Sequence, residues 1–125
     1  MNAGDAFLFV DRSVDGHLWV VVSDPPSDPD RVLLVSLCSA TPENDNACRL
    51  DQGDHPWIRQ PTTVYYGMTE VVSLSTLVLM LKNNEVEMQA PLSSEVLARI
   101  REGFRESRFA RLDDERLLID QDLID

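Results

Sequence analysis

Two histidines are the side chains of this sequence best suited to acid–base chemistry. His17 opens the strongly apolar segment 17–23, and His55 lies within the turn segment 53–57, which reads GDHPW. Histidine changes its charge near neutral pH, so it serves as a general acid or base when it lies at the mouth of a sheet. We expect both histidines near a site. The alternative for each is a surface or hydrogen-bonded structural role.

Four further side chains are candidates for contacts with a substrate: Asp54, Trp57, Thr63 and Tyr65. Trp57 offers a flat ring on which a base can stack, although core packing is the more common role of a large aromatic side chain. Thr63 and Tyr65 belong to a segment that predicts a strand. We expect these side chains to line the same sheet mouth as the histidines.

The sequence contains no recognisable metal or cofactor motif. Cys38 and Cys48 are ten residues apart, and neither has a second cysteine or a histidine at ligand spacing. Asp54 and His55 would join them only through tertiary contact. A glycine-rich phosphate loop and a Gly-x-Ser-x-Gly elbow are both absent. We predict no metal, no cofactor, two structural thiols and a reduced, cytoplasmic setting.

Length and charge exclude several classes of protein. The chain has 125 residues, of which 43% are apolar, and a formal net charge of −11. This length and apolar content suit one compact domain and exclude a disordered chain. No apolar run reaches the roughly 18 residues of a membrane-spanning helix, and we expect no secretion signal. The negative charge argues against loose, non-specific binding to nucleic acid.

The charges are unevenly distributed along the chain. Six of the ten arginines lie between positions 99 and 116, whereas segment 113–125 holds six acidic side chains and one arginine. We favour a solvated, loosely held acidic tail. Two alternatives remain open. The tail folds back over the arginines, or its apolar residues within 117–124 dock onto another copy or a partner.

Short apolar segments predict a sheet, followed by one clear helix. Segments 5–10 and 17–23 are expected to form a hairpin with its turn near 12–16. Further strands are predicted at 31–37, 47–50, 62–66, 70–74 and 86–89, while 75–81 is ambiguous between helix and strand. Apolar residues at helical spacing after the cap sequence Pro91-Leu92-Ser93 predict a helix that ends near Ser107.

This order of elements predicts a mainly β fold with one or two helices. We expect a small, strongly bent β-barrel with a C-terminal helix packed across it. Residues 1–112 would form this single domain, and residues 113–125 would form the acidic tail.

Several short motifs occur in a recognisable order along residues 4–107. Gly4-Asp5 precedes the first strand, valine-rich strands follow at 20–23 and 32–37, segments 62–66 and 68–74 come next, and Leu92-Ser93 leads into the helix. This order resembles the MazF/PemK-type toxin family. The resemblance implies an SH3-like barrel, cleavage of single-stranded RNA, a homodimer and an acidic antitoxin as partner.

The chain departs from this family at the residues that would carry catalysis. His17-Leu18 stands where the family has Arg-Pro, and Ser36 or Ser39 stands where it has a threonine. Metal-independent RNA cleavage needs a base, an acid and a donor to the phosphate oxygens. The resemblance therefore implies His17 and His55 in the first two roles and Arg59 in the third. Ser36 would replace the threonine.

Two functions are compatible with these observations. The first is a toxin-like endoribonuclease of a toxin–antitoxin or defence system. The second is a non-catalytic protein-interaction module built on the same barrel. The first function is our leading hypothesis, and the missing arginine and threonine and the acidity of the chain favour the second as its alternative.

Overall fold

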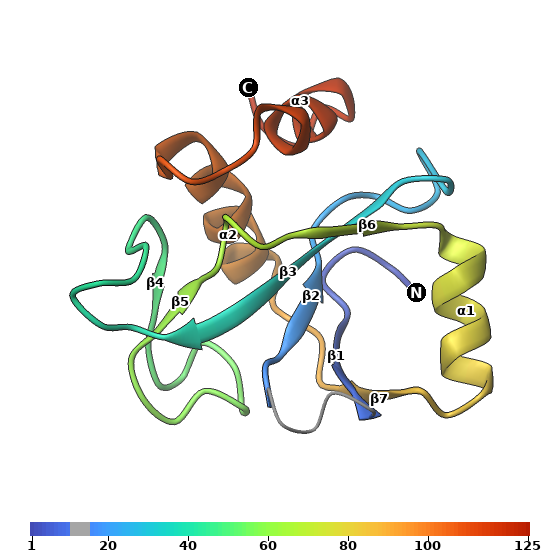
Figure 1. Cartoon of the computed structure of the whole chain (residues 1–125), viewed down its shortest axis with the longest axis horizontal. Helices are drawn as coiled ribbons and strands as arrows, with labels where there is room; N and C mark the ends of the chain where they lie inside the picture. The colour runs from blue at the N-terminus through green and yellow to red at the C-terminus, as the bar shows by residue number, and fades with distance from the viewer. Residues whose placement is uncertain (11–15) are drawn as a thin grey trace.

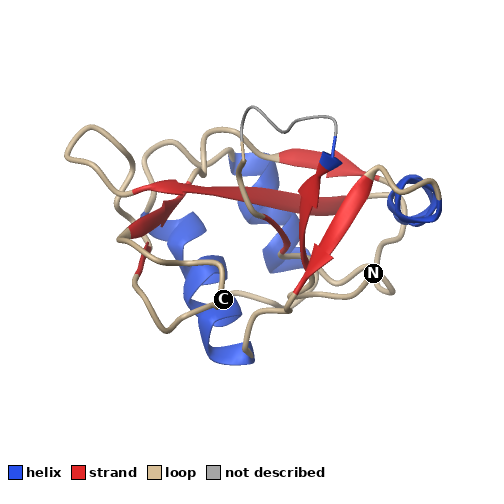
Figure 2. Cartoon of the chain, turned by 90° about the horizontal axis from the view of Figure 1, so that it is seen from below, coloured by secondary structure: helices blue, strands red, loops and turns tan. Residues whose placement is uncertain are grey.

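The computed structural model of the chain describes residues 1–10 and 16–125. They form one sheet of seven strands with three helices, shown in Figure 1 and Figure 2. The strands are β1 Ala6–Phe9, β2 Trp19–Val21, β3 Val32–Ser39, β4 Arg49–Leu50, β5 Thr62–Val64, β6 Glu70–Val72 and β7 Val86–Gln89. The helices are α1 Leu74–Lys82, α2 Ser94–Glu106 and α3 Leu112–Asp120. The mainly β class is confirmed, with three helices in place of the one or two expected.

The predicted hairpin is present in the structure. β1 pairs antiparallel with β2, and Ala6 lies opposite Val20. The turn predicted near 12–16 falls almost wholly on residues 11–15, outside the described part of the chain. β1 also pairs with β7, so the N-terminal strand lies between two strands from distant parts of the sequence.

The longest strand, β3, joins the two halves of the sheet. Its first half pairs antiparallel with β2 and β6, and its last residues pair with β5, where Ser39 lies opposite Thr62. The full strand order is β4-β5-β3-β2-β1-β7, with β6 also paired to β3. β3 therefore carries residues of both sheet halves, including Ser36 and Cys38.

The expected closed barrel is not formed by the described residues. Closure of a sheet requires its two outermost strands to pair with each other, but the strand path ends at β4 on one side and β7 on the other. β4 contributes only the two residues Arg49–Leu50, and helix α1 contacts β7, as Figure 1 shows. The sheet is therefore open, and its outer strands are covered or short.

The central strands are apolar on both faces because helices cover both faces. One face packs with α2 and α3 in the larger core, to which β2 and β3 contribute Val20, Leu33, Val35 and Leu37. The opposite face packs against Leu77 of α1, and it consists of Phe7, Phe9, Trp19, Val21, Val32 and Leu34. Figure 2 shows α1 end-on at one end of the sheet, apart from the other two helices. Burial on both faces explains why these segments read as almost unbroken apolar runs.

Capping side chains define where two of the helices begin. Ser93 Oγ accepts the N–H of Val96 at 3.2 Å, which confirms the predicted helix as α2. Ser73 Oγ accepts the N–H of Thr76 at 3.1 Å, and the ambiguous segment 75–81 is helical as part of α1. No helix in the described ranges is long and apolar enough to cross a membrane.

The acidic C-terminal segment is part of the core, which corrects the expectation of a loosely held tail. α3 buries Leu117 and Leu118 against the larger core, and Ile124 follows them. Gln121 Oε1 accepts the backbone N–H of Asp24 at 2.8 Å. The apolar side chains interspersed among the acidic ones supply the burial that keeps this segment folded. Arg105 of α2 donates to the backbone oxygen of Asp125, so the chain end does fold back onto one of the arginines.

Candidate binding site

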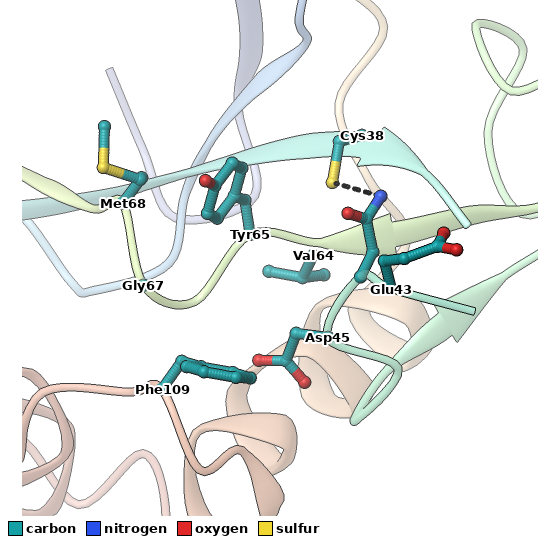
Figure 3. Close-up of a pocket in the computed structure, with 9 residues that line it drawn as sticks. Cys38, Glu43, Asp45, Val64, Tyr65, Gly67, Met68 and Phe109 are labelled. Carbon is teal, nitrogen blue, oxygen red and sulfur yellow. Dashed lines mark hydrogen bonds between the residues drawn. The ribbon is translucent and has the colours of Figure 1, made fainter. Parts of the chain in front are cut away.

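A cleft of about 360 Å³ opens where three loops meet at one end of β3. Its main side chains come from the end of β3 and the β3–β4 loop (Cys38, Glu43, Asp45), from the β5–β6 loop (Tyr65, Met68) and from the α2–α3 loop (Phe109). We call it the aromatic cleft. Figure 3 shows Tyr65 and Met68 on one side of it and Phe109 on the other.

Large apolar side chains at this cleft remain in contact with solvent. Tyr65 is 45% exposed, Met68 is 58% exposed and Phe109 is 61% exposed. Single exposed apolar residues are common, but several that surround one hollow are typical of a binding surface. Gly67 brings the β5–β6 loop close to Phe109, since a Cβ at this position would lie 3.4 Å from Phe109 Cβ.

Two carboxylates form the acidic side of the cleft. Asp45 is half-buried, and its Oδ1 accepts the backbone N–H of Ala47 at 3.0 Å while its Oδ2 accepts the hydroxyl of Ser107. Each carboxylate oxygen has a second acceptor site that these bonds leave free. Glu43 is exposed. Within residues 1–10 and 16–125, neither Glu43 nor Asp45 forms an ion pair with a basic side chain.

The loop that carries these carboxylates is held by its own side chains. Asn46 Nδ2 donates to the carbonyls of Thr41 at 3.1 Å and Asn44 at 2.8 Å. Asn44 Nδ2 donates to the carbonyl of Ser39, and the hydroxyl of Thr63 donates to the carbonyls of Asp45 and Cys48. These hydrogen bonds hold the β3–β4 side of the cleft in place, and a preformed site lowers the entropic cost of binding any ligand.

Cys38 lies in this cleft as a thiol. Burial raises the pKa of Cys38 above its ordinary value, and the nearby carboxylate of Asp45 raises it further. Asn44 Nδ2 approaches the sulfur at 3.9 Å, drawn as the dashed line in Figure 3. Because the thiolate is the nucleophilic form, this environment disfavours covalent catalysis by Cys38.

His17 lies in a second, smaller pocket of about 260 Å³ together with Trp57, Arg59 and Thr62. His17 Nδ1 is 2.8 Å from the carbonyl of Leu37. A carbonyl only accepts hydrogen bonds, so Nδ1 carries the proton and Nε2 is the basic nitrogen. Among the described residues, none forms a hydrogen bond with Nε2. One pocket therefore contains His17, Arg59 and Trp57.

His55 is bound on both sides of its ring and is 4% exposed. Its Nε2 donates to the carbonyl of Ala90 at 2.5 Å, and its Nδ1 accepts the backbone N–H of Trp57 at 3.0 Å. With both nitrogens engaged, the ring has no free position for proton exchange with a substrate. His55 and His17 line separate hollows that share Trp57 and Arg59. In this arrangement His55 shapes the loop around residue 57.

The remaining predicted residues have mainly structural contacts. Ser36 is buried within β3, and Thr63 is buried where it ties β5 to the β3–β4 loop. Asp54 accepts the backbone N–H of Asp51 at 2.8 Å and pairs with Arg99 at 3.1 Å. These two donors, the backbone N–H first, hold the pKa of Asp54 below its ordinary value. Of the four predicted substrate contacts, Tyr65 alone lies at the aromatic cleft.

Sequence reasoning missed most of the aromatic cleft. Phe109 and Met68 lie in loops without periodicity, and Asp45 lies in a polar, irregular segment. The available signal was an apolar side chain placed between Arg108 and Arg111 after a helix end. No group of three or more His, Cys, Asp or Glu side chains in the described ranges is arranged to hold a metal ion. Comparison of the chain with models of known families, with curated proteins and with solved structures finds no match.

Proposed function

We propose that this chain is a protein-interaction module that binds a segment of a partner protein in the aromatic cleft. The observation that carries the proposal is the ring of exposed apolar side chains, Tyr65, Met68 and Phe109, around a hollow of about 360 Å³. Binding sites combine such apolar walls with a few fixed polar groups. Here the fixed groups are the carboxylates of Asp45 and Glu43.

The chemistry of the cleft favours a polypeptide over a nucleic acid. Its charged side chains are both acidic, and phosphate groups would be repelled by them. The whole chain carries a formal charge of −11, which adds to this repulsion. Preorganised loops and exposed aromatic side chains are instead typical of surfaces that anchor a protruding side chain of another protein.

A peptide-library selection tests this function directly. We would select peptides on the wild-type protein and measure the Kd of the best of them for wild type, Phe109→Ala and Met68→Ala. We expect each cleft variant to weaken binding by at least about tenfold, as for buried interface anchors. Leu112→Ala is the matched control, because Leu112 is 81% exposed and lies outside the cleft.

The control distinguishes binding in the cleft from non-specific binding to exposed apolar side chains. If the Kd of the selected peptide for Leu112→Ala stays within about twofold of its Kd for wild type, the result supports the cleft as the binding site. Equal affinity of the selected peptides for wild type, Phe109→Ala and Met68→Ala would overturn the proposal. Circular dichroism of each variant shows that a loss of binding is not a loss of fold.

A second candidate function, metal-independent cleavage of single-stranded RNA, is favoured by the pocket around His17. There Nε2 of His17 is the basic nitrogen, and Arg59 and Trp57 line the same hollow. His17 would take the proton of a ribose 2′-hydroxyl as its oxygen attacks the adjacent phosphorus. The bond from phosphorus to the 5′-oxygen would break, and that oxygen would take a proton from water, because both ring nitrogens of His55 are engaged. Arg59 would hold the phosphate oxygens, and Trp57 would stack on a base. The resemblance of the sequence to MazF/PemK-type toxins also supports this candidate. It would imply an SH3-like barrel, a homodimer and an acidic antitoxin as partner.

An assay with a single-stranded RNA of mixed sequence in a chelating buffer tests the second candidate. We expect fragments that end in a 2′,3′-cyclic phosphate, and we expect their formation to be abolished in His17→Ala. Tyr65→Ala serves as the control, because Tyr65 lies in the other cleft. Intact RNA after prolonged incubation with the wild-type protein would rule out this function.

A further inference from the structure

We propose that the aromatic cleft takes an arginine side chain of the partner segment, held between Tyr65 and Phe109 with the carboxylates of Asp45 and Glu43 as acceptors. This inference rests on the proposed interaction function and names the chemistry of its ligand. It is argued from unpaired negative charge, from aromatic surface and from the geometry of the cleft.

Asp45 is half-buried, and the described residues provide it with two neutral hydrogen-bond donors and no cation. A partly desolvated carboxylate gains most from a charge-assisted hydrogen bond. Its charge acts within the cleft, where burial first and the carboxylate of Asp45 second raise the pKa of Cys38. A cationic ligand would neutralise this charge.

Tyr65 and Phe109 lie on opposite sides of the opening, and Asp45 lies beside Phe109, as Figure 3 shows. A guanidinium group is planar, stacks on aromatic faces and directs its N–H groups outward from its edge. An arginine placed between the rings can therefore donate to the free acceptor sites of Asp45. The ammonium of lysine matches the charge but not the flat shape.

Arg108 and Arg111 flank Phe109 in the sequence, yet neither lines the cleft. Arg105 is engaged with Glu102 and the backbone oxygen of Asp125, and Arg99 is engaged with Asp54. No basic side chain of the described residues occupies the cleft, which is therefore open to an arginine of a partner.

The test uses four blocked pentapeptides, acetyl-Ala-Leu-X-Leu-Ala-amide, in which X is arginine, citrulline, lysine or norleucine. Citrulline keeps the shape of arginine and removes its charge. We would measure Kd by titration and, independently, the protection of Cys38 from alkylation. We expect the arginine peptide to bind at least about tenfold more tightly than the citrulline and norleucine peptides, and more tightly than the lysine peptide.

Protein variants locate the contact. Asp45→Asn removes the charge and keeps one acceptor, the amide oxygen, for the N–H of Ala47, while its NH2 group replaces the oxygen that accepts the hydroxyl of Ser107. Circular dichroism and a urea titration of this variant show whether it is folded. Glu43→Gln changes an exposed residue without risk to the fold. We expect Asp45→Asn to weaken the arginine peptide about tenfold and the norleucine peptide less than twofold. Asp113→Asn is the control, because Asp113 is exposed and lies outside the cleft.

The outcomes separate this inference from the proposed function. If the norleucine or citrulline peptide binds as tightly as the arginine peptide, the inference is wrong while the interaction function stands. If neither these peptides nor library-selected ones bind, both are wrong. If an RNA oligonucleotide protects Cys38 and the arginine peptide does not, the cleft binds RNA and the inference is overturned.

Discussion

The hydroxyl of Tyr66 occupies the space where a side chain of Gly103 would begin. Tyr66 donates to the carbonyl of Ile100 at 2.6 Å, and its ring meets that of Phe104 edge-on at 4.7 Å between centroids. A Cβ at position 103 would overlap the Tyr66 hydroxyl. This contact joins the β5–β6 loop to α2, and it fixes Tyr66 inward while Tyr65 faces the cleft.

The first prediction is that Gly103→Ala destabilises the fold. In most helix interiors this change is favourable by about 1 kcal/mol, because alanine is the better helix former. Here the added methyl group must displace a fully buried ring, and overpacking costs about 1–3 kcal/mol. We expect a lower free energy of unfolding in urea. Glu106→Ala, an exposed change in the same helix, should stay within about 0.5 kcal/mol of wild type.

The second prediction concerns the hydrogen bond that attaches α3. Thr69 Oγ1 donates to Asp114 Oδ2 at 2.6 Å, and both side chains are buried. Thr69→Val keeps the shape of the side chain and leaves the carboxylate without this donor. We expect a loss of about 2 kcal/mol in the free energy of unfolding, because an unsatisfied buried charged group is costly.

Hydrogen exchange identifies which elements lose stability in Thr69→Val. The amides of α3 should exchange faster in Thr69→Val, while those of β2 and β3 change little at low denaturant. Thr76→Val is the control, because its hydroxyl pairs with Ser73 on the exposed start of α1. Unchanged exchange in α3 would show that the Thr69–Asp114 bond does not anchor the helix.

Much of the sheet could be predicted from the sequence, because short β-branched runs bounded by Pro and Gly indicate strands strongly. The helix at 94–106 also had a cap and an apolar stripe. The segment of α1 has apolar residues on every side, so the spacing of its apolar residues did not distinguish a helix from a strand. Its cap, Ser73, was the missed signal. The docking of α3 could not be predicted from its own sequence, because it depends on the core surface that Leu117 and Leu118 cover in the folded chain.

The candidate site was harder to predict than the fold. The aromatic cleft joins loops that lie up to about seventy residues apart, from Cys38 to Phe109, and no local pattern links them. The turn around His55 was correctly predicted to be constrained. The carbonyl that occupies its Nε2 belongs to Ala90, thirty-five residues away, and so the engagement of the ring followed only from the tertiary fold.

The third prediction is a loss of stability at alkaline pH that depends on Cys48. Burial raises the pKa of this thiol above the ordinary value of 9.0. The unfolded chain therefore loses the proton first, and the stabilisation is complete below about pH 9 and lost as the pH rises through the folded pKa. In Cys48→Ala this contribution is absent. The difference in unfolding free energy between wild type and Cys48→Ala should shrink from pH 8 to pH 10.

Alkylation gives a second measurement for the two thiols. Cys48 is buried and should react with iodoacetamide only when the chain unfolds, whereas half-buried Cys38 should react slowly in the folded state. Rapid modification of Cys48 under native conditions would contradict the burial on which the pH prediction depends.

The fourth prediction separates the roles of the two histidines. His55→Ala removes one acceptor and one donor at once, leaving the N–H of Trp57 and the carbonyl of Ala90 without their partner. We expect a loss of about 1–3 kcal/mol in the free energy of unfolding, since each of the two hydrogen bonds contributes about 0.5–1.5 kcal/mol and the ring that makes them is 4% exposed. His17→Ala removes a single bond at a half-buried position and should cost about 1 kcal/mol.

Activity per folded molecule then decides whether His55 takes part in chemistry. If the chain cleaves RNA, His55→Ala assayed well below its Tm should keep a rate within about threefold of wild type, because no ring nitrogen of His55 is free to exchange a proton. His17→Ala should remain folded and lose the activity. A fully folded His55→Ala without activity would reverse the assignment if Trp57→Ala, which tests the loop that His55 shapes, keeps its activity. The loss would then require the ring of His55 to leave Ala90 and Trp57 and enter the site during turnover.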